Sequence, residues 1–521
     1  MKKPRQKKSP PPRKPTGENP AERKPGPQGV EEPSALDPIV APGSPKKFRA
    51  RVRMYRHGLG DCFLLTFPRE GKPPFHMLID CGALARDATF MTRIVKHIRD
   101  TVRGGETTGK ARLDVVVATH EHKDHVSGFN QAREVFNNDF DFGAVWLGWT
   151  ENLSKPEIKK IKETRKKAIA KLEAMLASPQ AAAAGEALDG VAALLGFSQD
   201  EDETGCGRVA DALEYLKLRG KDAGDLRYLE PGGEPFGLDG VDGVRVYVLA
   251  PPRDPILLKS SEVTERMKRE GVIYHLSSTG EAGMDALSAA VTGSPGTAED
   301  RYHPFSAEHR ITRTVADLSN PGVSRPNPYF SALQSFVAET YDDPRQAWRR
   351  IDHDWLSAFG QLALDLDNDT NNTCLVLAIE FQKTRDVLLF VGDAQVGSWQ
   401  SWAKLGFKVP GREQPLPALD LLGRTVFYKV GHHCSHNATL KDGGLELMTR
   451  DDLVAFIPLD QATAKKQGTK GWEMPAPPLF RALKEKAAKR VVISDVSEKL
   501  TPEATAAGVL ATGTYVDYFL K

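Results

Sequence analysis

An aliphatic run that ends in a dense group of histidines constrains the fold of this chain more than any other feature. Residues 113–118, LDVVVA, are typical of a short strand that is buried on both faces. The next seven residues, THEHKDH, place His120, His122, Asp124 and His125 within six positions. A regular helix or strand cannot direct all four side chains to one point, but a turn directly after a strand can fan them outward. We therefore expect a polar site at the end of this strand.

The chemistry of these four side chains points to metal binding. Imidazole and carboxylate groups are ligands for divalent ions of borderline softness. Fanned from one turn, two of the side chains would serve one ion and two would serve its neighbour. Paired ions about 3.5–4 Å apart activate water and stabilise both the attacking and the leaving oxygen of a displacement. The motif thus predicts two divalent ions, Zn²⁺ or Mn²⁺, bound through His120, His122, Asp124 and His125.

Two later strand-like stretches end in residues of the same chemistry. Asp393 follows Gly392 in LLFVGDA, and its carboxylate is suited to bridge two cations. His432 and His433 follow another glycine in FYKVGHH, and one of them would complete the second metal position. Two adjacent histidines cannot be ranked from sequence. His432 is taken as the ligand, with His433 as the alternative.

Two groups of strands and helices predict an α/β fold. The first group occupies residues 47–252 and includes a mostly helical segment at 151–222, and the second occupies residues 369–521. Residues 253–368 show no clear strand periodicity and separate the groups as an insertion with helical patches. Such an arrangement is typical of a layered αββα sandwich with a helical insertion. Within the first group, residues 126–136 predict a single helix.

Basic residues gather in two places. Residues 1–46 are rich in Pro, Lys and Arg, which predicts a disordered tail. The first 47 residues hold eleven Lys/Arg against five Asp/Glu, so they carry +6 and the remainder of this +2 chain carries −4. A predicted helix in the segment 151–222 has a polar face that includes Lys159, Arg165 and Lys166. Both regions would attract a nucleic acid, or else serve as a solubilising extension and a solvated face.

The composition, 40% hydrophobic and 27% charged residues, is that of an ordinary soluble globular protein. No run approaches 18 apolar residues, so no membrane span and no membrane partner are expected. The N-terminus lacks the apolar core of a secretory signal, which favours a cytoplasmic location. Scattered cysteines without a CxxC pair fit reduced thiols in that compartment. The five are Cys62, Cys81, Cys206, Cys374 and Cys434.

The motif THEHKDH resembles the T-H-x-H-x-D-H signature of the metallo-β-lactamase fold hydrolases. Together with GLGDCFLLTF, LIDCG, NNTCLVL, LLFVGDA and YKVGHHCSH, it is similar to the metallo-β-lactamase-like domain of the competence protein ComEC. The resemblance covers residues 48–150, 225–252 and 370–500. It implies an αββα sandwich with metals at the edge between its sheets. It also implies that Asp80 orients the metal-binding loop without binding metal, and that Asp393 bridges the ions.

The chain departs from this family at two kinds of position. Cys374 and Cys434 stand where the family has Ser and Gly, and Cys434 is either a packing residue or a thiolate ligand. The third-motif histidine, which completes the first metal position in better-known members, has no clear match. The first ion would then be held by His120, His122, Asp393 and water. Candidates without motif support are His275, His303, His309 and His353 in the insertion.

The predicted activity is metal-dependent hydrolysis of phosphodiesters, most simply by a nuclease acting on DNA or RNA. Water activated by the ions would attack phosphorus, and both ions would neutralise the developing charge. The catalytic residues would be Asp124, as a metal ligand, and His433 or His436, as the proton donor to the leaving oxygen. Either histidine would otherwise fix a neighbouring imidazole by a hydrogen bond. The substrate-contacting residues would be Lys159, Arg165 and Lys166.

Two other classes of function fit the same residues, because one fold hosts several chemistries. The first is hydrolysis of a small thioester or lactone, which requires a closed apolar pocket beside the metals, whereas a nuclease needs an open basic groove. The second is a non-catalytic binding module, which the missing third-motif histidine favours. Metal content per chain would separate this module from both hydrolases. The residues identify no protein partner.

Overall fold

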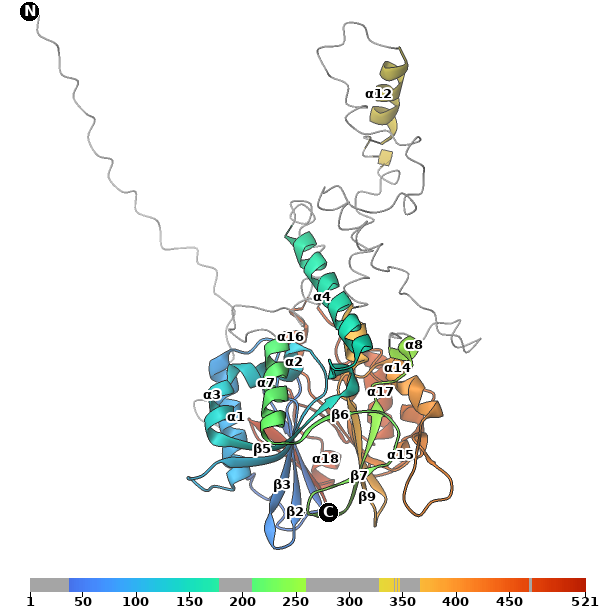
Figure 1. Ribbon diagram of the computed structural model, residues 1–521. Helices are drawn as coiled ribbons and strands as arrows, with labels where there is room; N and C mark the ends of the chain where they lie inside the picture. The colour runs from blue at the N-terminus through green and yellow to red at the C-terminus, as the bar shows by residue number, and fades with distance from the viewer. Residues whose placement is uncertain are drawn as a thin grey trace, which may run out of the picture. The chain divides into compact units, whose positions relative to one another are not determined.

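Two mixed β-sheets form the centre of the fold in a computed structural model that describes residues 37–177, 209–258, 328–341, 343, 345–346, 366–467 and 471–521 (Figure 1). The strand order of the first sheet is β16 (Val509–Ala511), β17 (Tyr515–Leu520), β1 (Ala50–Tyr55), β2 (Phe63–Arg69), β3 (Lys72–Ile79), β4 (Ala111–Ala118), β5 (Phe140–Gly148) and β6 (Leu226–Leu229). The order of the second is β15 (Val491–Ile493), β14 (Val454–Ile457), β13 (Thr425–Lys429), β10 (Asp386–Phe390), β9 (Val376–Phe381), β8 (Val241–Ala250) and β7 (Phe236–Leu238). A small separate sheet pairs β11 (Gly406–Phe407) with β12 (Leu416–Pro417).

Each large sheet is antiparallel on one side and parallel on the other. In the first sheet, the pairs from β16 to β3 are antiparallel and the pairs from β3 to β6 are parallel. In the second, the pairs from β7 to β10 are antiparallel and those from β10 to β15 are parallel. Parallel neighbours end at the same edge of a sheet. The loops after β3 and β4 therefore share one edge, as do the loops after β10 and β13.

Buried apolar side chains form three clusters that define the layers. One cluster contains residues of both sheets, such as Phe63 and Phe390, whose rings meet edge to face with centroids 5.8 Å apart. The second packs the first sheet against helices α1 (Ala88–Arg103), α2 (Lys123–Gln131), α3 (Arg133–Asp139) and α7 (Val209–Asp222). The third packs the second sheet against α14 (Val396–Ser401), α15 (Leu419–Leu422) and α17 (Pro477–Lys486). Figure 1 shows these two sets of helices on opposite sides of the strands. The prediction of an α/β protein is confirmed.

The remaining described helices are α4 (Pro156–Leu176), α8 (Pro255–Leu258), α12 (Pro328–Thr340), α16 (Gln461–Ala464), α18 (Pro502–Ala506) and the short turns η1 (Trp149–Glu151), η6 (Trp402–Lys404), η7 (Gly431–Cys434) and η8 (Leu445–Leu447). Of the predicted insertion, the structure describes α8, α12 and a helical turn at 366–371. Its other residues lie mostly outside the described ranges, as do residues 1–36 of the predicted tail. None of the helices described here is both long and apolar enough to cross a membrane.

Helix α1 shows how local sequence sets the bounds of an element. The Asp87 side chain accepts a hydrogen bond from the Phe90 backbone N at 2.8 Å, which caps the start of the helix. Gly104, with φ of 66°, ends it in the left-handed conformation that glycine adopts without strain. Met91, Ile94 and Ile98 recur at helical spacing and are buried against the first sheet.

The prediction of one helix at residues 126–136 is wrong in its bounds. The structure has two helices, α2 and α3, which meet at Ala132, where φ of −113° and ψ of 25° interrupt the helical path. The break lets Phe129 and Phe136 pack with ring centroids 5.2 Å apart, so tertiary packing overrides a continuous pattern. Helix α2 also begins three residues earlier than predicted, so Asp124 and His125 lie in its first turn.

A buried histidine on α1 fastens the described start of the chain to the first sheet. The two ring nitrogens of His97 lie 3.2 Å from the Tyr55 hydroxyl and 3.1 Å from the Asp37 carbonyl oxygen. Because the carbonyl can only accept, Nε2 carries the proton and Nδ1 accepts from Tyr55. Burial and the nearby Arg53 guanidinium lower the pKa of His97 to about 4.

This neutral histidine predicts a loss of stability in acid. An unfolded histidine has a pKa of 6.5, so between pH 6.5 and 4 the unfolded chain binds the proton that folded His97 refuses. Stability from this group is complete above pH 6.5 and falls with pH, by at most about 1.4 kcal/mol per pH unit. His97→Gln keeps a donor and an acceptor but does not titrate. Urea unfolding at pH 7, 6 and 5 should give the variant the shallower pH dependence; parallel curves would contradict the assignment.

Candidate metal centre

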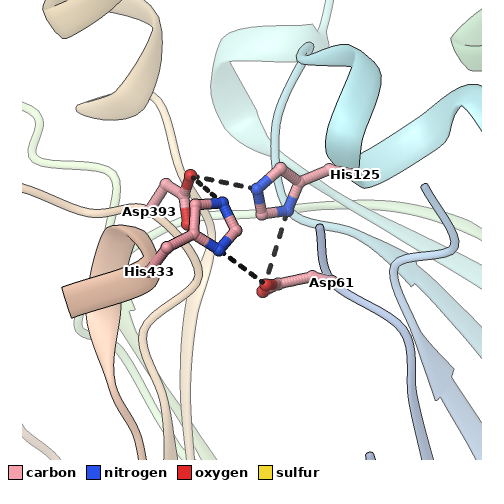
Figure 2. Close-up of side chains that lie close together, drawn as sticks. All are labelled: Asp61, His125, Asp393 and His433. Atoms are coloured by element: carbon pink, nitrogen blue, oxygen red, sulfur yellow. Dashed lines mark ion pairs between the residues drawn. The ribbon is translucent and has the colours of Figure 1, made fainter. Parts of the chain in front are cut away.

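Loops from both sheets bring a group of acidic and imidazole side chains together (Figure 2). Asp61 precedes β2 and His125 follows β4 in the first sheet, while Asp393 follows β10 and His433 follows β13 in the second. All four residues are buried, and one ligand atom from each lies within 4.8 Å of the others. This group could hold a metal ion.

Hydrogen bonds decide which nitrogen of each ring is available to a cation. His125 Nδ1 lies 2.8 Å from an Asp80 carboxylate oxygen, and His433 Nδ1 lies 2.6 Å from the Pro458 carbonyl oxygen. Both oxygens accept, so the neutral form of each ring carries its proton on Nδ1 and presents a bare Nε2. Figure 2 shows Asp393 on the Nε2 side of the two rings and Asp61 on the Nδ1 side. A cation bound through both Nε2 atoms would therefore lie on the Asp393 side.

Asp124 lies on the same side of the two rings. Its Oδ2 is 2.9 Å from His433 Nε2 and 3.7 Å from His125 Nε2. The Oδ2 of Asp393 is 3.1 Å from His125 Nε2 and 3.5 Å from His433 Nε2. Two nitrogens and two oxygens thus surround one point. Asp124 Oδ1 and His125 Nε2 are buried without a hydrogen-bond partner among the described residues, and a divalent ion would satisfy such atoms.

The pKa values of the two rings reflect the same arrangement. Burial lowers the pKa of His125 and of His433, but the carboxylates of Asp393 and Asp124 overcome this and raise both above the usual value. The carboxylates in turn favour positive charge between them. A divalent ion supplies that charge in place of the ring protons, so its binding should weaken as pH falls.

His120 and His122 form a second group beside the first. His120 Nε2 lies 3.1 Å from His122 Nδ1, close to the separation of about 3.3 Å between two nitrogen ligands of one tetrahedral zinc ion. The hydroxyl of Thr119 donates to Asp80 at 2.7 Å, so its oxygen is left to accept from His120 Nδ1 at 3.1 Å. Burial lowers the pKa of His122 to about 3 and that of His120 well below its usual value. Both rings are neutral, as metal binding requires.

Asp80 contacts the His125 ring on the side that faces away from Asp393. It accepts hydrogen bonds from the backbone N and the hydroxyl of Thr119, both at 2.7 Å, and from His125 Nδ1 at 2.8 Å. The backbone φ of Asp80 is 56°, a left-handed conformation that is uncommon for residues other than Gly, Asn and Asp. Asp80 thus orients His125 through the nitrogen that faces away from the cation position, and its oxygens are occupied by donors.

His432 and His433 lie in one strained turn, and their rings point to different partners. His432, His433 and Cys434 have φ values of 40°, 49° and 66°, a conformation that residues with a side chain rarely adopt. The turn directs His433 toward Asp124 and leaves His432 Nδ1 at 2.8 Å from the Ser435 hydroxyl oxygen. Of the two candidate ligands, the structure brings His433 into the cluster and places His432 beside it.

A buried lysine balances the carboxylates. Lys429 Nζ lies 2.6 Å from Asp61 Oδ2, 3.4 Å from Asp393 Oδ1 and 2.7 Å from the Gly392 carbonyl oxygen, and the side chain is 1% exposed. Burial lowers the pKa of Lys429, but Asp61 and Asp393 raise it above its usual value. Asp61 is therefore paired with this cation. Neither residue was predicted as a site residue, although a lysine within the apolar strand TVFYK is an available signal.

Two cysteines of the predicted motifs, Cys374 and Cys434, are buried near the cluster or behind it. Cys374 Sγ accepts a hydrogen bond from the Asp393 backbone N at 3.2 Å, so it helps to fix the backbone that carries this carboxylate. Cys434 is buried in the cluster that packs on the second sheet. Burial raises the pKa of each thiol to about 12, which disfavours the thiolate that a metal would need. The packing alternative for Cys434 is therefore the one that its surroundings favour.

The predicted substrate-contacting residues on α4 divide into two groups. Lys159 and Lys166 are exposed, and Lys159 lies 4.0 Å from Glu163 of the same helix. Arg165 instead lies 3.6 Å from Glu121, which stands between the two histidines of the metal motif. Lys162 reaches the same Glu121 carboxylate at 2.6 Å, so the helix is anchored to the metal-binding loop.

The remaining histidine candidates, and one aspartate that the sequence did not single out, complete the picture. His436 is exposed. Asp367, from the turn at 366–371, is buried with Oδ1 3.6 Å from His122 Nε2. Burial and the charges of Asp124 and Asp393 raise the pKa of Asp367 to about 8. Four insertion histidines lie outside the described residues: His275, His303, His309 and His353.

No protein-family model matches the chain, and no curated protein matches it. The likeness to the metallo-β-lactamase fold hydrolases thus remains a prediction from the sequence motifs.

Replacing Lys162 tests whether α4 supports the metal-binding loop. Lys162→Met removes the cation that lies 2.6 Å from both Glu121 and Glu151. Because Lys162 is 23% exposed, we expect a loss of about 2 kcal/mol, less than for a fully buried pair. The matched control is Lys159→Met, at a side chain that is 67% exposed, with an expected change within about 0.5 kcal/mol. Urea unfolding measures both, and equal losses would exclude a supporting role for Lys162.

The adjacent histidines after β13 provide a matched pair for metal binding. His433→Ala removes the Nε2 that faces Asp124 and Asp393, so at least one ion per chain should be lost. His432→Ala removes a ring whose Nδ1 faces Ser435, and the ion content should stay at the wild-type level. Elemental analysis of dialysed protein reads out both variants. The reverse pattern would make His432 the ligand.

Proposed function

We propose that this protein is a metal-dependent hydrolase of the metallo-β-lactamase type, which cleaves phosphodiester bonds in nucleic acid at a centre of two divalent ions. The observation that carries the proposal is the convergence of bare imidazole nitrogens and carboxylate oxygens from both sheets on adjacent points. One position is assigned to His120 and His122, and the other to Asp124, His125 and His433, with Asp393 between them.

The layers support a sandwich of the αββα type. The two sheets share an apolar cluster, and helices cover the opposite face of each sheet. The candidate ligands follow β4, β10 and β13, so they come from the ends of parallel strands in both sheets. Together with the motif THEHKDH, this placement favours the fold that the sequence resemblance implies.

The residues present suit a pair of divalent ions. Such a pair, when bound, supplies activated water and neutralises charge on a phosphoryl oxygen. Lys429 and Cys374 hold Asp393 in place, and Asp80 fixes the tautomer of His125. Both ring nitrogens of His433 already have partners, the Pro458 carbonyl oxygen and the Asp124 carboxylate, so proton donation to the leaving oxygen is assigned to the exposed His436.

Nucleic acid is the proposed substrate because a basic helix begins beside the metal-binding loop. Helix α4 is anchored to Glu121 by Lys162 and Arg165, which leaves Lys159, Lys160 and Lys166 exposed. A row of exposed lysines on a helix tied to the motif is suited to contact phosphates. Zn²⁺ or Mn²⁺ is the proposed metal, since the ligand set mixes imidazole with carboxylate.

Two substitutions at the centre test the proposed chemistry. His122→Ala and Asp393→Ala should each lower the rate of phosphodiester cleavage about a hundredfold or more, or roughly 2.7 kcal/mol, because each removes a group that positions the ions. Asp442→Asn, at an exposed aspartate, is the control and should leave the rate unchanged. The assay uses single- and double-stranded DNA and RNA with Zn²⁺ or Mn²⁺, and circular dichroism checks that each variant is folded.

Activity on small carbonyl substrates alone would contradict the proposed phosphodiesterase activity. A wild-type protein that is loaded with metal and hydrolyses a thioester or lactone, yet leaves all four nucleic acids intact, is a hydrolase of small carbonyl compounds and not a nuclease. A protein that binds metal and cleaves none of these substrates is a binding module.

A further inference from the structure

The helical turn at 366–371 brings a buried carboxylate to the metal motif from the end of the long segment between β8 and β9. Asp367 is 7% exposed, and its Oδ1 lies 3.6 Å from His122 Nε2. Its Oδ2 accepts a hydrogen bond from the Asn371 side-chain amide at 3.1 Å, which fixes the carboxylate within the turn. No motif in the sequence pointed to this residue.

The other three histidines of the centre show what such an oxygen does. In each, the ring nitrogen that faces away from the cluster points at an oxygen acceptor: Asp80 for His125, the Pro458 carbonyl for His433 and the Thr119 hydroxyl for His120. An acceptor at the outer nitrogen sets the tautomer and aims the bare inner nitrogen. For His122 the inner nitrogen is Nδ1, which faces His120, and the outer nitrogen is Nε2. Asp367 lies on that outer side.

The tautomer of His122 decides whether a cation can bind beside His120. With a proton on Nε2, His122 presents a bare Nδ1 to the bare Nε2 of His120 at 3.1 Å. Two lone pairs at this distance repel each other unless a cation lies between them. With the proton on Nδ1, the two rings would instead share a hydrogen bond, and the pair could not bind metal.

A charged carboxylate at this buried position lowers the stability of the fold, which an uncharged side chain would not do. Asp367 is buried, and the charges of Asp124 and Asp393 act on it. Burying a charge near like charges destabilises a protein unless a cation compensates. The charged form of Asp367 is thus unfavourable in the metal-free protein, and a bound cation would favour it.

We propose that Asp367 is a positioning residue of the metal centre: it accepts a hydrogen bond from His122 Nε2 and so fixes the tautomer that binds the ion beside His120. The inference rests on the two-metal centre of the proposed function but not on the substrate. A movement of about 0.4 Å brings the two atoms within hydrogen-bond distance. The segment between β8 and β9 thereby contributes to the first metal position, where the sequence predicted no residue beyond His120, His122 and Asp393.

Metal titration of the full chain tests this role without an activity assay. Metal-free wild type, Asp367→Ala and Asp367→Asn are titrated with Zn²⁺ or Mn²⁺ in equilibrium dialysis, and the unfolding midpoint of each metal-free protein is measured. Asp367→Ala should weaken one of the two binding events by about 10- to 100-fold and leave the other unchanged. Asp367→Asn retains a carbonyl acceptor and should lose less. Asp369→Asn, in the same helical turn, is the matched control and should bind as wild type does.

The stability of the metal-free variants shows whether Asp367 positions His122 or only supports the fold. The metal-free Asp367→Asn protein should be at least as stable as wild type, because the amide has the size of the carboxyl group and cannot carry a charge beside Asp124 and Asp393. Unchanged affinity in both Asp367 variants, or a loss of metal-free stability in step with the loss of affinity, would overturn the proposal. A complete loss of one ion in Asp367→Asn would also overturn it, since that result would make Asp367 a direct ligand. If wild type binds two ions but cleaves no nucleic acid, the proposed function fails while this inference stands.

Discussion

The buried carboxylates of Asp61, Asp124 and Asp393 limit how the two sheets can meet. Unlike an apolar contact, each of these groups needs a compensating charge, because two like charges about 4 Å apart repel by roughly 4 kcal/mol at the effective dielectric constant of a protein. Lys429 compensates Asp61 and one oxygen of Asp393. The Oδ2 atoms of Asp393 and Asp124 face the Nε2 atoms of His125 and His433. A cation at that point joins loops of both sheets, so we expect metal binding and the packing of the sheets to be coupled.

The loop that carries the motif THEHKDH has contacts outside the cluster as well as within it. Asp80 and Thr119 fix the rings of His120 and His125, and Glu121 points the other way into ion pairs with Lys162 and Arg165. Arg165, predicted from sequence to contact substrate, therefore has a protein partner. One side of helix α4 is thus anchored to Glu121, and under the proposed function its exposed lysines would contact a polyanion.

Much of this arrangement follows from sequence, because it depends on local spacing. The aliphatic run before the motif THEHKDH predicted both a strand and a cluster at its end, and Asp393 was found through the same pattern. The sequence could not show which of His432 and His433 joins the cluster. The answer depends on three successive positive φ values, and no residue type at these positions indicates them. The pairs Lys429–Asp61 and Asp367–His122 join segments far apart in the chain. Strand β17, which pairs with β1, was not predicted, because its neighbour is more than 400 residues away.

The central claim is that two adjacent cation positions lie on the inner side of the four rings. Anomalous X-ray diffraction from crystals of the zinc-loaded protein measures this directly. The account predicts two peaks about 3.5–4 Å apart. One should lie between His120 Nε2 and His122 Nδ1, and the other among Asp124 Oδ2, Asp393 Oδ2 and the Nε2 atoms of His125 and His433. A single peak on the Asp61 side, bound through the Nδ1 atoms of His125 and His433, would contradict it.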